Sequence, residues 1–174
     1  HKEVFRRASL AAMAGSLISG DLPEALVVEE HGRLYSVSLL GQRNTGIFLE
    51  ARAIRDDIQG RCRGKTVLNL FSYTGAFAIA ALKGGARQVI NIDSNRNVHK
   101  RAQGNYRLNK LAVDERDFVT ARFDEALRFY KKKKQSFEVI VFDPPPASRQ
   151  GRKRFRSRRD YMKCFGQLLA ILAP

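Results

Sequence analysis

The chain has 174 residues, 44% of them hydrophobic, and no apolar run reaches the roughly 18 residues that a transmembrane helix needs. Its 32 Lys and Arg against 17 Asp and Glu give a net charge of +15, which indicates a polyanionic partner, with nucleic acid the leading candidate. Two cysteines without metal-ligand spacing exclude a disulfide framework and a zinc site. They fit a reducing cytosol, so we expect a cytoplasmic protein without a membrane partner.

The first predicted elements are a helix and a β-hairpin. Apolar residues return at helical spacing from about Lys2 to Ser19, which predicts a helix rather than a secretory leader. Alternating apolar residues on either side of His31 and Gly32 predict a hairpin over residues 26–40, with the glycine accepting a positive φ at the turn. We expect residues 1–45 to form a lead-in segment and residues 46–174 to form the main domain.

The main domain is predicted to alternate strands and helices. Residues 41–60 indicate a loop, a short strand and a helix. From there on, strands are expected at 66–71, 88–93, 116–120 and 137–143, and helices at 75–85, 95–111, 122–134 and 158–172. Apolar β-branched runs between amphipathic helices are typical of a parallel sheet with helical crossovers. The fold class is therefore a doubly wound, Rossmann-like α/β domain, with a sheet that we expect to lack its last strands.

The turn FSYTG, which follows the first of these strands, is the first candidate binding element. A dinucleotide fold usually has GxGxxG here, and the single glycine disfavours NAD or FAD. S-adenosylmethionine carries no phosphate, and Ser72, Tyr73 and Thr74 offer hydroxyls and backbone donors near its carboxylate. Gly75 would let the backbone approach its methionine portion. The alternative is a tight turn with a polar cap.

Two carboxylates at strand ends are the next candidates. Asp93 can accept both hydroxyls of a ribose, although an aspartate before a helix can equally be an N-cap. Asp143 precedes Pro144 and Pro145, which fix φ and remove backbone donors, so its side chain is left to hold a planar base edge. The alternative for this stretch is a strand that simply ends at prolines.

Together these motifs resemble a known family. The ordered succession of TGIFLEAR, VLNLFSYTGAFAIAALKGGARQVINID, NYRLNKL and VIVFDPP is similar to the class I S-adenosylmethionine-dependent ribosomal RNA methyltransferases of the RlmI/RlmK-like group. The resemblance implies S-adenosylmethionine as cofactor and large-subunit (23S-type) ribosomal RNA as substrate. It assigns cofactor binding to Arg52, Phe71, Ser72, Tyr73, Thr74, Gly75, Asp93, Ser94 and Phe118, and catalysis to Asp143, Pro144 and Pro145.

The chain departs from the family pattern at three places. Glu50 and Ala51 precede Arg52 where LDxR is usual, and Pro146 follows the DPP motif where other enzymes have an aromatic residue or a cysteine. Thr120, Ala121 and Arg122 stand where an acidic residue often meets the adenine amino group, so Asp117, Asp124 or a backbone carbonyl would have to substitute.

Histidine and cysteine chemistry has little support. We expect His31 to be a turn residue, His99 to be a solvated side chain on a polar helix, and Cys62 and Cys164 to be small packing residues. A ring nitrogen or an exocyclic amine could attack the methyl directly, whereas cytosine carbon-5 needs an activating cysteine. The resemblance implies that cytosine-5 members of the family carry that cysteine in a later part of the fold, so the target atom (cytosine C5, guanine N7 or N2, or another) stays open.

A basic segment follows the DPPP motif. Seven of the eleven residues from Arg149 to Arg159 are Arg or Lys, and we expect this loop to reach the flanking phosphates of a bound RNA. The RNA-binding residues assigned here are Arg149, Arg152, Lys153, Arg154, Phe155 and Arg156. The alternative for the segment is a solvated loop, and the alternatives for the whole chain are an RNA-binding module without methyltransferase activity or, more weakly, an NAD-dependent enzyme.

Overall fold

The computed structural model describes residues 5–6, 16–17, 19–21, 23, 26–39, 44–144, 149–150, 153–154 and 158–173. Its centre is a sheet of four parallel strands in the order β7-β6-β5-β8. The strands are β5 (Thr66–Leu70), β6 (Gln88–Asp93), β7 (Phe118–Thr120) and β8 (Val139–Phe142). The predicted parallel α/β class is confirmed.

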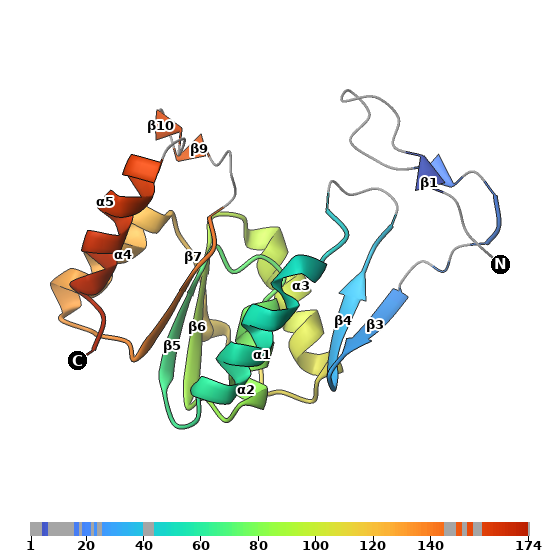
Figure 1. Cartoon of the computed structure of the whole chain (residues 1–174), viewed down its shortest axis with the longest axis horizontal. Helices are drawn as coiled ribbons and strands as arrows, with labels where there is room; N and C mark the ends of the chain where they lie inside the picture. The colour runs from blue at the N-terminus through green and yellow to red at the C-terminus, as the bar shows by residue number, and fades with distance from the viewer. Residues whose placement is uncertain are drawn as a thin grey trace.

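Helices cover both faces of this sheet (Figure 1). On one face lie α1 (Arg52–Arg61), α2 (Ala76–Lys83) and α3 (Arg96–Leu108), and on the other lie α4 (Phe123–Lys133) and α5 (Arg158–Leu169). The strands alternate between two apolar cores: Val67 and Val141 pack on the α1–α2 side, whereas Leu68 and Phe142 face α4 and α5. Because both faces are buried, the strands read as nearly continuous apolar runs.

The predicted hairpin is present and packs on the sheet domain. β3 (Leu26–Glu30) and β4 (Arg33–Val37) are antiparallel, and both turn residues have positive φ, His31 at 48° and Gly32 at 76°. Tyr35 is fully buried in the core formed by α1 and α2. The turn role expected for His31 is confirmed, and its Nδ1 lies 3.0 Å from Asp56 Oδ1 on α1.

Polar side chains of α3 complete the attachment of this hairpin. Asn109 Oδ1 accepts from Leu34 N at 2.9 Å, and Asn109 Nδ2 donates to Leu34 O at 2.6 Å. One helical turn earlier, Asn105 Oδ1 accepts from Ser36 N at 2.8 Å. The two amides therefore pair with the outer edge of β4 as a neighbouring strand would.

Three local predictions are wrong. The helix expected over residues 2–19 is contradicted where the structure describes it, because β1 (Phe5–Arg6) and β2 (Ser16–Leu17) form an antiparallel pair. Helical spacing is a weak prior that tertiary context overrides. The short strand expected after the 41–46 loop is instead the 3-10 helix η1 (Leu49–Ala51). His99 is buried against β7, with its Nε2 at 3.2 Å from Val119 O, rather than solvated.

The remaining elements are short. The 3-10 helix η2 (Glu115–Asp117) precedes β7, and the strand pair β9 (Arg149–Gln150) and β10 (Lys153–Arg154) follows β8. Figure 1 shows β9 and β10 beyond the end of the sheet at which β8 finishes. None of the helices in the described part of the chain combines the length and apolar character needed to span a bilayer.

Candidate active site

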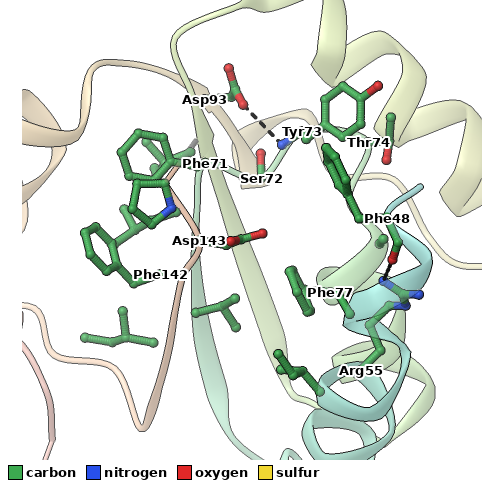
Figure 2. Close-up of a pocket in the computed structure, with 18 of the residues that line it drawn as sticks. Phe48, Arg55, Phe71, Ser72, Tyr73, Thr74, Phe77, Asp93, Phe142 and Asp143 are labelled. Atoms are coloured by element: carbon green, nitrogen blue, oxygen red, sulfur yellow. Dashed lines mark hydrogen bonds between the residues drawn. The ribbon is translucent and has the colours of Figure 1, made fainter. Parts of the chain in front are cut away.

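A cavity of about 1010 Å³ opens where β5, β6 and β8 end (Figure 2). Three groups of residues from these strand ends line it: Phe71 to Thr74, Asp93 and Ser94, and Asp143 with Pro144. The segment that leads into α1 forms much of the opposite wall. The carboxyl ends of strands are where open parallel sheets hold their ligands, and the structure brings the three strand-end motifs together there.

The turn after β5 has an unusual backbone. Phe71 and Tyr73 have φ of 58° and 46°, and Gly75 has φ of 77°, so three of five residues are left-handed. For Phe and Tyr this conformation is strained and persists only when the surroundings hold it. Here Tyr73 N donates to Asp93 Oδ2 at 3.1 Å and Gly75 N donates to Ser72 O at 2.9 Å. The chain therefore holds this turn in a shape that its own residues disfavour.

Gly75 packs closely against α3 and does not line the cavity. A Cβ on this residue would lie 3.1 Å from Ala102 Cβ and 3.4 Å from a ring carbon of Tyr106, both on α3. Its missing side chain thus leaves room for α3 rather than for a ligand. The glycine is required by its positive φ and by the close packing of α3.

The hydroxyls of the turn are not equally available. Thr74 Oγ1 donates to Gly46 O at 2.6 Å, and Tyr73 OH donates to Asn44 O at 3.3 Å, so both fasten the segment before α1. Ser72 Oγ is buried and has no hydrogen-bond partner within the described residues, although Ser72 lines the cavity. Burying an unpaired hydroxyl is costly, which makes Ser72 the turn's best candidate for contacting a ligand.

Asp93 is a turn anchor and a cavity residue. Its two carboxylate oxygens accept from Tyr73 N and from Asn95 N, the latter at 2.9 Å. The N-cap of α3 is Asn95, whose Oδ1 accepts from Asn97 N, so the alternative that Asp93 is the cap is wrong. A carboxylate with several acceptor positions can serve these two amides and still face a ligand.

Asp143 follows β8, the strand next to β5, and lines the cavity between its two aromatic walls. Desolvation by the cavity walls, together with the negative charge of Glu50, raises the pKa of its carboxyl. The carbonyl of Pro144 accepts from Tyr161 OH at 3.4 Å, which fastens the start of the proline stretch to α5. Pro145 falls outside the described residues.

Besides Gly75, two further residues assigned to cofactor binding do not line the cavity. Arg52 points to the hairpin, where its Nε is 3.4 Å from Glu30 Oε2. Phe118 packs on Tyr106 and His99 with ring centroids 5.1 and 5.9 Å apart. Both lie near cavity residues in sequence, but their side chains leave the backbone in other directions.

The substitutes expected for an adenine contact are also elsewhere. Asp117 accepts from Gln88 Nε2 at 2.7 Å, and Asp124 pairs with Arg122 and Arg128. Neither aspartate lines the cavity, whereas residues 121–123 do. Of the three substitutes considered, only the backbone of this stretch belongs to residues that line the cavity.

Several cavity residues were missed by sequence reasoning. They are Phe48, Arg55, Phe77, Phe142 and Tyr161. In a helical pattern, an apolar residue is predicted to lie in the core and a cationic residue on the solvated surface. The local sequence therefore does not identify these five as cavity residues. Figure 2 shows Phe71 and Phe142 on one wall, Phe48 and Tyr73 on the other, and Asp143 between them.

Metal and thiol chemistry find no support in this part of the molecule. The described residues contain no group of three or more His, Cys, Asp or Glu that could hold a metal ion. Cys62 and Cys164 are both buried, neither lines the cavity, and burial raises the pKa of the Cys62 thiol. The packing role expected for both cysteines agrees with this burial.

The open parallel sheet with a ligand cavity at its carboxyl edge is a doubly wound fold. The turn after its first strand is not a phosphate-binding glycine loop, which favours a cofactor without a pyrophosphate. A family model described as S-adenosylmethionine-dependent methyltransferase matches residues 3–174. The chain belongs to this family, and the family's cofactor is S-adenosylmethionine. The unpaired Ser72 hydroxyl and the Asp93 carboxylate on the cavity wall fit such a group.

Individual relatives agree with the family. Two curated proteins named ribosomal RNA large subunit methyltransferase I are similar to this chain. The one from Cronobacter sakazakii is 41% identical over 134 residues, which are 76% of this chain and 34% of the relative. The one from Citrobacter koseri is 40% identical over 129 residues, or 74% and 33%. The chain thus spans about a third of the length of these relatives.

A solved structure extends the similarity to nearly the whole chain. The crystal structure of SMU.776, a proposed methyltransferase complexed with SAH, superposes with a TM-score of 0.90 at 29% identity. The match covers 99% of this chain and 45% of that one.

Proposed function

We propose that this chain is the S-adenosylmethionine-binding part of a methyltransferase that modifies a nucleobase of large-subunit (23S-type) ribosomal RNA, and that it works in the cytoplasm. The observation that supports this most is the convergence of Ser72, Asp93 and Asp143, which follow three adjacent strands, on one cavity. The names of the relatives and the charge of +15 favour RNA as the substrate.

The cofactor would be held by the residues that the structure leaves available. In this proposal the Asp93 carboxylate accepts from the ribose hydroxyls and the Ser72 hydroxyl bonds the amino-acid portion. When bound, the cofactor supplies an activated methyl group on a sulfonium. The leaving group is already good, so the chain contributes mainly by holding the nucleophile and the methyl close and in line.

Asp143 is proposed to orient the target base. A carboxylate at this position can accept from an exocyclic amine or a ring N–H and so direct the neighbouring lone pair at the methyl. Its raised pKa favours accepting the proton that a nitrogen loses when it gains a methyl group. Neither described cysteine reaches the cavity, so carbon-5 chemistry has no nucleophile among these residues.

Methyl transfer to unmodified ribosomal RNA tests this proposal. With methyl-labelled S-adenosylmethionine, the chain should place label in RNA, as the Cronobacter relative should in parallel. Asp143→Ala should reduce transfer at least ten-fold while the affinity for S-adenosylhomocysteine stays within two-fold, because an interaction that positions the nucleophile has been removed. Asp57→Ala, outside the cavity, is the control.

The outcomes separate the proposal from its alternative. If wild-type chain binds RNA but transfers no label while the relative does, the RNA-binding module without activity is favoured. Loss of rate and cofactor affinity together in Asp143→Ala would assign Asp143 to the cofactor instead of the base.

A further inference from the structure

Two aromatic rings at the cavity wall have no assigned contact with the target base. Phe48 and Tyr73, which we call the aromatic pair, have ring centroids 5.8 Å apart and planes tilted by 49°. Both line the cavity that also contains Asp143, and Figure 2 shows them on the side opposite Phe71 and Phe142. Phe48 is 41% exposed, so its ring is accessible from the cavity that it lines.

The backbone of Phe48 is fixed by a buried ion pair. Arg55 Nη1 donates to Phe48 O at 2.9 Å, and Arg55 is 1% exposed. The same guanidinium donates to both oxygens of Glu30, at 2.8 and 2.6 Å, and Glu30 is 4% exposed. A two-pronged contact of this kind is strong and geometrically specific. A buried charge pair therefore holds an exposed apolar residue in place.

Tyr73 is also held in place, both through its backbone and through its ring. Its backbone is in the left-handed region and is anchored by Asp93, and its hydroxyl donates to Asn44 O. The guanidinium of Arg101 lies 5.7 Å from its ring centroid, a cation–π contact. Neither ring has to be ordered when a ligand arrives, which is the condition for tight binding at low entropic cost.

We infer that the aromatic pair is a stacking site for an unpaired nucleobase that enters the cavity. Because the two planes are tilted, a base lying on Phe48 meets Tyr73 at its edge, a favourable aromatic arrangement. A flat, π-faced ligand is what two preorganised rings at a cavity wall recognise, one exposed and one half-buried. Single-stranded RNA supplies such bases on a polyanionic backbone. The inference deepens the proposed function and rests on it, since it names how that substrate is gripped.

The test isolates stacking from charge. The affinity of the chain for an eight-nucleotide single-stranded RNA is divided by its affinity for an abasic ribose-phosphate chain of the same length, so that phosphate contacts cancel. Phe48→Ala should lower this ratio roughly 5- to 150-fold, the loss expected for one stacked base. Phe48→Trp should keep or raise it. Leu49→Ala is the matched control, because Leu49 is adjacent, 64% exposed and outside the cavity lining.

Each outcome has one meaning. An unchanged ratio in Phe48→Ala, or an equal fall in Leu49→Ala, overturns the stacking site. A fall in S-adenosylhomocysteine affinity with the RNA ratio intact also overturns it, since Phe48 would then face the cofactor. Circular dichroism checks folding, and Phe48→Leu, which keeps the apolar contact but not the ring, replaces the alanine variant if that one unfolds. The ratio needs no methyl transfer, so failure of the proposed function and failure of this inference are seen separately.

Discussion

The Asp93 carboxylate joins the turn after β5 to the start of α3 while facing the cavity. Asp93→Ala should weaken S-adenosylhomocysteine binding by about 1–3 kcal/mol, since charge-assisted hydrogen bonds to the ribose are removed and the turn at Tyr73 loses its anchor. Calorimetry measures the change. Asp114→Ala, which removes an exposed aspartate outside the cavity, is the control, and an unchanged affinity in Asp93→Ala would remove Asp93 from the site.

At this scale the sequence predicts which residues end strands but not where their side chains point. Asp93 and Asp143 follow apolar runs, so their place at the sheet edge could be derived. Gly75 and Phe118 sit in the same motifs, yet one makes room for α3 and the other packs on Tyr106. The direction of a side chain depends on the backbone dihedral angles of its residue. Those angles are fixed by contacts with residues that are distant in the sequence.

At the scale of elements, a buried ion pair between Glu30 and Arg55 connects β3 to α1. Glu30→Gln should lower the free energy of unfolding by about 3–5 kcal/mol at pH 7, because Arg55 would be left buried without its carboxylate and Arg33 would keep only Asp56. Urea unfolding measures this, with Glu29→Gln on the exposed face of β3 as the control.

The same ion pair makes the free energy of unfolding depend on pH. The hydrogen bond from Arg55, opposed by desolvation and aided by the charges of Arg55 and Arg33, lowers the pKa of Glu30 below 4.5. A lowered folded-state pKa means that the stabilisation is complete above 4.5 and is lost as the pH falls through the lowered value. The difference between wild type and Glu30→Gln should therefore shrink in acid, and a constant difference down to about pH 2 would contradict the assignment.

The positions of the strands and helices could largely be predicted from the sequence, whereas the side-chain contacts between them could not. From Thr66 onward, the strands and helices of the sheet lie where periodicity placed them, because the pattern there is long and regular. The attachment of the hairpin by Asn105 and Asn109 could not be foreseen, since a polar residue on a helix reads as solvated. The same reasoning misjudged His99.

For the whole molecule, the net charge of +15 should make the affinity for RNA fall as the salt concentration rises. Changing Arg152, Lys153, Arg154 and Arg156 to serine should weaken RNA binding and flatten its dependence on salt, by about 0.7 in the log–log slope for each phosphate that the variant no longer binds. The affinity for S-adenosylhomocysteine should barely change. Fluorescence titration at several salt concentrations measures both effects.

A control of equal charge is available on α4. Lys131 to Lys134 end this helix and lead toward the start of β8, at the edge of the sheet away from the cavity. Their replacement by serine also removes four positive charges. If this variant flattens the slope and the first does not, the RNA surface lies on α4 instead of on the segment after β8.

The amide contacts between β4 and α3 also have a consequence for synthesis. Leu34 and its partner Asn109 are 75 residues apart. At roughly 5–20 residues per second, a nascent chain completes the hairpin about 4–15 s before those amides exist. During that interval the outer edge of β4 presents free peptide groups, which are a template for pairing with another chain. Ribosome-bound chains stalled before residue 105 should accordingly be cut by protease within residues 26–37, and chains stalled well after residue 109 should be protected there.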